Sequence, residues 1–206
     1  MTLTTLLYFL GASIALSLAP GPDNIFVVTQ GIARGRKAAI VTALGMCSGI
    51  SVHTTAAAFG ISALFYSSLV AFTIIKYAGA AYLLYLAWRT LRERAAIRLA
   101  KADDRPGAAL FKRGFIMNVL NPKVAMFFLA FLPQFVTPKA SHFALQMLFL
   151  GFIFMLQAIV IFCLIGYFSG SIGNLILTRP RIGKYLDFMT AGVFTSLGIR
   201  LALAER

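Results

Sequence analysis

Residues 3–33 read LTTLLYFLGASIALSLAPGPDNIFVVTQGIA, an apolar run whose one charge is Asp23 and which is interrupted by Pro20-Gly21-Pro22. A helix needs about 20 apolar residues to cross a hydrocarbon core of roughly 30 Å. This run is too long for one straight crossing, and proline removes a backbone donor and clashes with the preceding turn. The stretch therefore predicts a membrane-spanning helix that is broken near its middle.

The composition of the whole chain supports a membrane protein. Of its 206 residues, 60% are hydrophobic and only 12% are charged, against about 25% charged residues in an ordinary soluble domain. The net charge is +13, but the basic residues stand in short clusters between apolar runs. That pattern indicates membrane topology rather than a nucleic-acid partner.

Apolar runs and their interruptions predict an all-α polytopic membrane protein with six transmembrane helices. One long apolar region is divided at Tyr66-Ser67-Ser68, and another run ends at Ser169-Gly170-Ser171. The six predicted spans are residues 3–33, 38–65, 69–88, 114–136, 142–168 and 185–204.

The distribution of basic residues predicts the orientation of these spans. The loops after the first, third and fifth spans carry fourteen basic residues: Arg34, Arg36, Lys37, Arg89, Arg92, Arg94, Arg98, Lys101, Arg105, Lys112, Arg113, Arg179, Arg181 and Lys184. The opposite side has Lys139 and Arg206, with Arg200 near the end of the last span. Because short cytoplasmic loops are enriched in Lys and Arg, both termini are expected in the periplasm.

The polar stretch 89–113 divides the chain, a single transporter domain, into two sets of three spans, residues 1–88 and 114–206. With an odd number of spans in each half, an internal repeat must be inverted in the membrane, as in many secondary transporters. We therefore expect two inverted three-helix repeats in which the first and fourth helices are broken.

The two halves carry matching interruptions. Pro22-Asp23 in the first half can be overlaid on Pro122-Lys123 in the second, where Asn121 is a plausible helix cap. Unpaired backbone groups at membrane depth are tolerated only against protein or a watery cavity. Paired interruptions therefore indicate a transporter binding site, although each proline could instead only kink a packed helix.

Asp23 and Lys123 are charges inside apolar spans, where a charge is costly and is normally paired or faces water. We expect the two to face each other, so that Asp23 binds the ammonium of a zwitterion and Lys123 its carboxylate. A salt bridge that only locks two helices is the alternative. The candidate substrate-binding residues are Pro20, Gly21, Pro22, Asp23, Asn24, Asn121, Pro122 and Lys123.

Proton coupling has two candidate residues, Asp23 and His53. His53 lies in the middle of the second span, and the ordinary titration range of imidazole suits proton exchange. The alternative is a structural hydrogen bond to a neighbour such as Thr54 or Ser51.

Several motifs together resemble the LysE/RhtB family of amino-acid exporters across essentially the whole chain. They are Pro20-Gly21-Pro22-Asp23, Gly35-Arg36-Lys37, Lys76-Tyr77-Ala78-Gly79-Ala80-Ala81-Tyr82-Leu83, Asn121-Pro122-Lys123 and Leu132-Pro133-Gln134-Phe135. This resemblance implies six transmembrane helices and export of amino acids or their derivatives across the bacterial inner membrane, driven by the proton motive force.

The residues also bear on competing functions. An enzyme, a metal site or an ATP-driven pump would need motifs that the chain lacks, so we expect no enzymatic activity and no metal or other cofactor. A single candidate acid favours neutral substrates such as threonine, homoserine or leucine. A divalent-metal exporter and a passive channel remain the alternatives.

Two small-residue motifs leave the oligomeric state open. Gly45-x-x-x-Gly49 and Gly166-x-x-x-Gly170 allow helices to approach closely. They predict packing within one subunit, with a homodimer as the alternative.

Overall fold

The computed structural model describes residues 2–19, 21–61, 69–92, 106–136, 142–178 and 180–203, and the regular elements in these ranges are all helical. In chain order they are α1 (Leu3–Leu18), α2 (Pro22–Arg34), α3 (Arg36–Ala56), the π-helix η1 (Ala57–Ile61), α5 (Leu69–Arg92), α6 (Gly107–Val119), α7 (Pro122–Met126), the π-helix η2 (Phe127–Phe131), the 3₁₀-helix η3 (Leu132–Phe135), α8 (Phe143–Tyr167), α9 (Ser169–Thr178) and α10 (Pro180–Leu203). The predicted all-α class is confirmed.

Up to five stretches of the described chain are long and apolar enough to cross a membrane. Three are single stretches, Arg36–Gly60, Phe143–Tyr167 and Ile182–Leu203. Two are bent pairs, α1 with α2 at 55° and α6 with the α7–η3 segment at 48°. Helix α5 occupies the predicted span 69–88 and is not among these five, so six crossings remain a prediction.

Both predicted interruptions are present. In the first, α1 ends at Leu18 and α2 begins at Pro22, with Gly21 in an extended conformation before it; Pro20 itself lies outside the described residues. In the second, the Asn121 side chain accepts a hydrogen bond from the Lys123 backbone N–H at 3.0 Å and so caps α7. Proline at the first helical position is compatible with a helix start, because that N–H has no partner within the helix.

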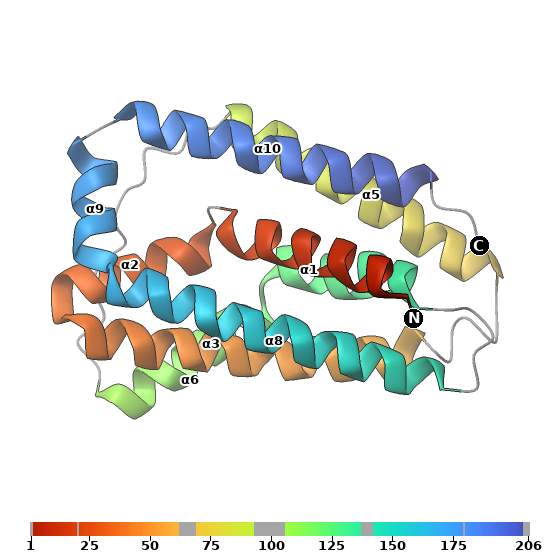
Figure 1. The fold of residues 1–206 in the computed structure, drawn as a ribbon, viewed down its shortest axis with the longest axis horizontal. Coiled ribbons are helices and arrows are strands. Elements are labelled where there is room, and N and C mark those ends of the chain that lie inside the picture. Colours follow the sequence, from red (N-terminus) through yellow and green to blue (C-terminus); the bar gives the residue numbers. More distant parts are fainter. Residues whose placement is uncertain are drawn as a thin grey trace.

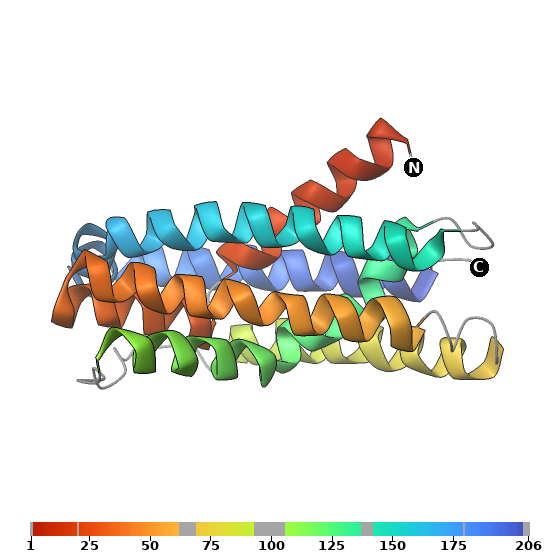
Figure 2. The same ribbon diagram turned by 90° about the horizontal axis from the view of Figure 1, so that it is seen from below.

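The helices run mostly along the long axis of the molecule (Figure 1). The start of α1 and the end of α10 lie at one end, which we call the terminal end. The α2–α3 turn lies at the opposite end, where Gly35 has a φ of 81°. Figure 2 shows that α1 leans out of the bundle toward its N-terminus.

Helix α3 packs against α6 and α8, and α5 packs along α10. Glycines permit the closest of these approaches: a Cβ at Gly45 would clash with the Phe111 backbone, and one at Gly114 with the Thr42 carbonyl. A Cβ at Gly49 would lie 3.0 Å from the Phe115 carbonyl oxygen. The Gly45-x-x-x-Gly49 face is therefore used inside the chain, between α3 and α6.

Phenylalanines form the centre of the core near the terminal end. Phe9 of α1 and Phe127, Phe128 and Phe131 of η2 are completely buried. The ring centre of Phe127 lies 5.1 Å from that of Phe131 and 5.3 Å from that of Phe154 in α8. These rings join the broken α6–η3 unit to α1 and α8.

Several predicted span boundaries differ from the structure. Helix α5 runs to Arg92 and α10 begins at Pro180, so Arg89, Arg92, Arg181 and Lys184 lie on helices instead of in loops. Helix α6 begins at Gly107 rather than near residue 114, so Lys112 and Arg113 lie on a helix instead of in a loop. The fifth span ends as predicted, but Ser169 then opens α9. Ser169 is 1% exposed and packs so closely on Gly31 that no Cβ would fit there, a tertiary contact that a local breaker motif does not reveal.

Candidate functional site

The two helix breaks meet in the interior of the bundle. The Asn121 side-chain nitrogen donates a hydrogen bond of 2.7 Å to Oδ2 of Asp23, which comes 98 positions earlier in the chain. Both side chains are buried, with 5% and 3% of their surfaces exposed. The cap of the second break is thus bonded to the acid of the first.

Lys123 makes the reciprocal connection. Its ammonium donates to the carbonyl oxygens of Ala19 at 3.1 Å and Leu16 at 3.3 Å. These carbonyls lie at the C-terminal end of α1, where backbone acceptors lack partners within the helix and a cation is favoured. Only 9% of the Lys123 surface is exposed, so α1 supplies the acceptors that the buried ammonium needs.

Gly21 lets this cation approach the first break. A Cβ built on Gly21 would lie 3.2 Å from the Lys123 ammonium nitrogen, with the Ala19 carbonyl oxygen 3.9 Å away. A larger residue at this position would press on the cation. The glycine of the Pro-Gly-Pro motif thus leaves room for a residue from the second half of the chain.

Further polar side chains extend this network. The Asn24 side chain donates to the Ser17 carbonyl at 2.9 Å, and the Gln157 side chain of α8 donates to the Ser17 hydroxyl at 3.0 Å. These bonds tie the end of α1, the start of α2 and the middle of α8 together.

A small cavity lies between the charged groups. It has a volume of about 20 Å³, and Ser17, Asp23, Asn118 and Lys123 supply its polar lining. A site for one water needs roughly 10–15 Å³, so this cavity is large enough for a single water. Asp23 and Lys123 both face it, but each bonds to other groups rather than to the other.

Four buried side-chain oxygens near the two breaks have no hydrogen-bond partner among the described residues, and those of Asp23 and Asn118 belong to residues that line the cavity. They are Oδ1 of Asp23, Oδ1 of Asn24, Oδ1 of Asn118 and Oε1 of Gln157. Buried polar atoms are normally satisfied, and all four of these are acceptors. The site therefore offers acceptor oxygens to a group that carries several N–H donors, such as an ammonium.

The structure brings together seven of the eight predicted substrate-binding residues: Gly21, Pro22, Asp23, Asn24, Asn121, Pro122 and Lys123. The eighth, Pro20, falls outside the described residues. Three further polar residues of the site were not predicted, Ser17, Asn118 and Gln157. A single polar residue in an apolar span does not indicate which helix its side chain faces. For Asn118 the one signal was its position, one helical turn before Asn121.

His53 lies beside this site. Its Nε2 is 3.0 Å from the Asn118 carbonyl oxygen, which can only accept, so Nε2 carries the proton of this bond. Thr54 and Ser51, the expected partners, instead donate to carbonyls of their own helix, those of Ile50 and Ser48. His53 thus holds the end of α6, immediately before the second break.

Comparison with known proteins agrees with the motifs quoted above. The chain matches the LysE type translocator family over residues 14–205. The protein belongs to this family. It is accordingly a transport protein of the membrane and not an enzyme, and no solved structure matches the chain.

Three relatives of this LysE-type translocator are similar along much of their length. An uncharacterized membrane protein of Vibrio cholerae is 32% identical over 203 residues, 97% of each chain. A homoserine/homoserine lactone efflux protein of Salmonella typhimurium is 38% identical over 144 residues, 69% of each chain. A leucine efflux protein of Salmonella choleraesuis is 31% identical over 205 residues, covering 96% of this chain and 94% of the relative.

Proposed function

We propose that this LysE-type translocator exports small neutral amino acids, of the homoserine, leucine or threonine kind, across the bacterial inner membrane. Relatives that align with most of the chain carry the names of homoserine and leucine efflux proteins. The observation that carries the proposal is the meeting of an acid, a cation and unpartnered acceptor oxygens at the two helix breaks.

The chemistry of the site suits a zwitterion. The substrate ammonium replaces the missing donors at Asp23 Oδ1 and at the amide oxygen of Asn118, which also lines the cavity. The substrate carboxylate draws the Lys123 ammonium away from the carbonyls of Leu16 and Ala19. Both interactions are charge-assisted and therefore stronger than neutral hydrogen bonds.

The cavity must open for this exchange to occur. A volume of about 20 Å³ is far below the roughly 300–1,000 Å³ of ordinary ligand pockets. In this proposal the structure is the closed state, and loading requires the helices around the breaks to move apart. The α1–α2 and α6–α7 breaks are the natural positions for that movement, because irregular backbone absorbs changes in φ and ψ.

Coupling to protons follows from the same carboxylate. Asp23 can hold a substrate ammonium only when it is ionised, and a proton on the carboxyl cancels that attraction. Proton and substrate therefore compete for one group, which is the requirement for exchange of an inward proton for an outward amino acid. His53 is a second candidate, since its ring bonds to the backbone of the cavity residue Asn118.

The test is efflux from cells preloaded with labelled homoserine, leucine or threonine, with and without a protonophore. We expect export of one or more of these amino acids, abolished by the protonophore. Lysine and a divalent metal ion serve as comparison solutes. Export of the metal alone would favour a metal exporter. Amino-acid efflux that the protonophore does not reduce would favour a passive channel. Either result overturns the proposal.

A further inference from the structure

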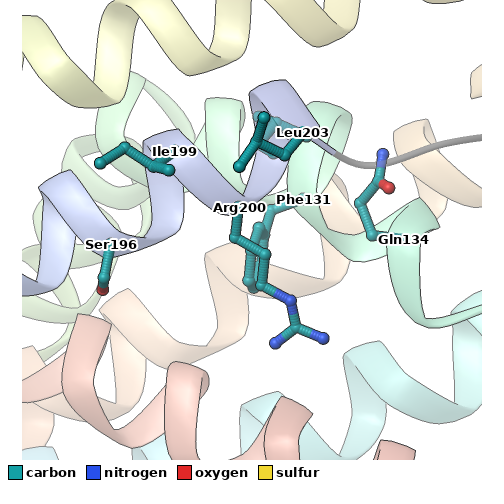
Figure 3. Close-up of a pocket in the computed structure, with 7 residues that line it drawn as sticks. Phe131, Gln134, Ser196, Ile199, Arg200 and Leu203 are labelled. Carbon is teal, nitrogen blue, oxygen red and sulfur yellow. The ribbon is translucent and has the colours of Figure 1, made fainter.

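A second and much larger pocket lies at the terminal end of the bundle, between the end of α10 and the η2–η3 segment. Its volume is about 650 Å³, and Phe131, Gln134, Ser196 and Arg200 are among the residues that line it. That volume lies within the range of ordinary ligand pockets. Figure 3 shows Arg200 extending from α10 alongside Phe131, with its guanidinium directed away from the helix.

Arg200 is the charged group among the described residues that line this pocket. Its guanidinium carbon lies 5.3 Å from the ring centre of Tyr8 in α1 and 5.2 Å from that of Phe135 in η3. Aromatic faces position the cation, but they leave the fork of N–H donors in its plane for an acceptor. Among the described residues that line the pocket none is acidic, so the lining provides no carboxylate for Arg200.

The other polar groups of the lining are neutral. The Gln134 side-chain nitrogen is buried without a partner in the described part of the chain. The Ser196 hydroxyl donates to the Val193 carbonyl at 2.9 Å and keeps its lone pairs for an ammonium. The pocket therefore has one strong anion receptor and weaker polar groups beside it.

A wall of aromatic rings separates this pocket from the central cavity. Phe154 lines the central cavity, and Phe131 lines the large pocket. The ring of Phe127 contacts both, with its centre 5.3 Å from that of Phe154 and 5.1 Å from that of Phe131. Buried ring contacts thus connect the lining of the central cavity to the lining of the large pocket.

We propose that the pocket around Arg200 is a second substrate site, which binds the carboxylate of the amino acid after it has passed the Phe127 ring and before release. This inference rests on the proposed function. The planar guanidinium matches a carboxylate in two parallel hydrogen bonds. A lipid phosphate offers the same chemistry, and the experiment must separate these two sources.

The test is exchange of labelled L-leucine in right-side-out and inside-out membrane vesicles, which present opposite faces of the protein. Arg200→Gln should raise the half-saturating concentration at the face that carries the termini by about tenfold or more. The value at the other face should stay within about twofold of wild type. Arg92→Gln is the matched control, because Arg92 also contacts an aromatic ring, that of Trp88 at 5.0 Å, but at the far end of α5.

Competition by L-leucinamide, which lacks the carboxylate, separates substrate from lipid. If Arg200 binds the substrate carboxylate, Arg200→Gln lowers the apparent affinity for leucine. The inhibition constant of leucinamide then stays unchanged. Equal weakening of both solutes assigns Arg200 to a lipid phosphate and overturns the proposal. Arg200→Lys keeps the charge but lacks the planar guanidinium, so its half-saturating leucine concentration should lie between those of wild type and Arg200→Gln. If Arg200→Gln inserts poorly, Arg200→Lys should still show a higher half-saturating concentration than wild type.

The two proposals fail differently. Wild-type exchange of leucine or homoserine, together with unchanged half-saturation in both Arg200 variants, removes the second site and leaves the proposed function intact. Absence of any exchange by the wild type, with the protein present in the membrane, removes the proposed function and the second site with it.

Discussion

Asp23 and Lys123 each bond to the break in the opposite half of the chain, and this reciprocity is the main feature at the residue scale. Asp23 accepts from Asn121, and Lys123 donates to the carbonyls at the end of α1. The sequence predicted that the two charges come together, because a charge in an apolar span needs a partner. It did not predict the partners, since backbone carbonyls carry no signature in the amino-acid sequence.

The polar residues around Asp23 and Lys123 show the same limit of prediction from sequence. Asn121 was predicted as a helix cap from its place before Pro122, and its side chain caps α7. Ser17 stands before the Pro-Gly-Pro motif and Gln157 lies in a span without a motif. Only the packing of α1 against α8 brings them to one point. Local chemistry is thus readable from sequence, whereas contacts between distant helices are not.

Gly21→Ala tests whether the approach of Lys123 to the first break matters for transport. The added methyl group would lie 3.2 Å from the ammonium nitrogen and would displace it from the α1 carbonyls. We expect a loss of efflux of about tenfold or more, equivalent to roughly 1.4 kcal/mol, with normal insertion. Gly11→Ala, also in this broken span, meets nothing within 4 Å and should transport like wild type; equal behaviour of the two variants would contradict the role of Gly21.

At the scale of elements, the broken α6–η3 unit differs most from its prediction. A helix with a proline break was expected, and the break at Asn121-Pro122 is present. The continuation is a five-residue α7, a π-helical turn and a 3₁₀ turn. Apolar periodicity does not distinguish these helix types over one or two turns, and π-helical turns are frequent at functional sites.

Phe127→Ala tests the wall that η2 places beside the central cavity. Removal of a completely buried ring opens space between the central cavity and the pocket at the terminal end. We expect faster downhill leak of L-leucine from vesicles in the presence of a protonophore, measured by loss of label. Phe149→Ala is the control, since Phe149 on α8 is 50% exposed. A folded Phe127→Ala protein with no more leak than the control would contradict the separating role of this ring.

At the scale of the whole molecule, corresponding elements of the two halves lie together. Helix α3 packs on α8, α5 packs on α10, and the two bent pairs meet at Asp23 and Asn121. We propose that this arrangement reflects two inverted repeats that residues 89–113 divide. Residues 89–92 and 107–113 are helical, so the predicted loop is shorter than expected, and residues 93–105 lie outside the described residues.

Topology is the prediction at this scale. The start of α1 and the end of α10 lie at one end of the bundle, and Arg34, Arg36 and Lys37 flank the turn at the other (Figure 1). Because basic residues favour the cytoplasmic side, a reporter fused within residues 95–105 should report cytoplasm. One fused at the C-terminus should report periplasm. Both fusions in one compartment would contradict six crossings with periplasmic termini.

The central claim is that Asp23 and Lys123 bind the transported zwitterion, and the double variant Asp23→Leu, Lys123→Met tests it most directly. Removal of a whole buried charged pair is often neutral for stability, so the double variant should still insert and fold. The matched control is Lys184→Met, Asp187→Leu, which removes a lysine and an aspartate from α10, away from the site. Efflux of preloaded labelled leucine or homoserine is measured for both. The account predicts no export by the Asp23/Lys123 variant and wild-type export by the control, whereas wild-type export by the Asp23/Lys123 variant would contradict the binding role and leave the two charges as structural links between the helix breaks.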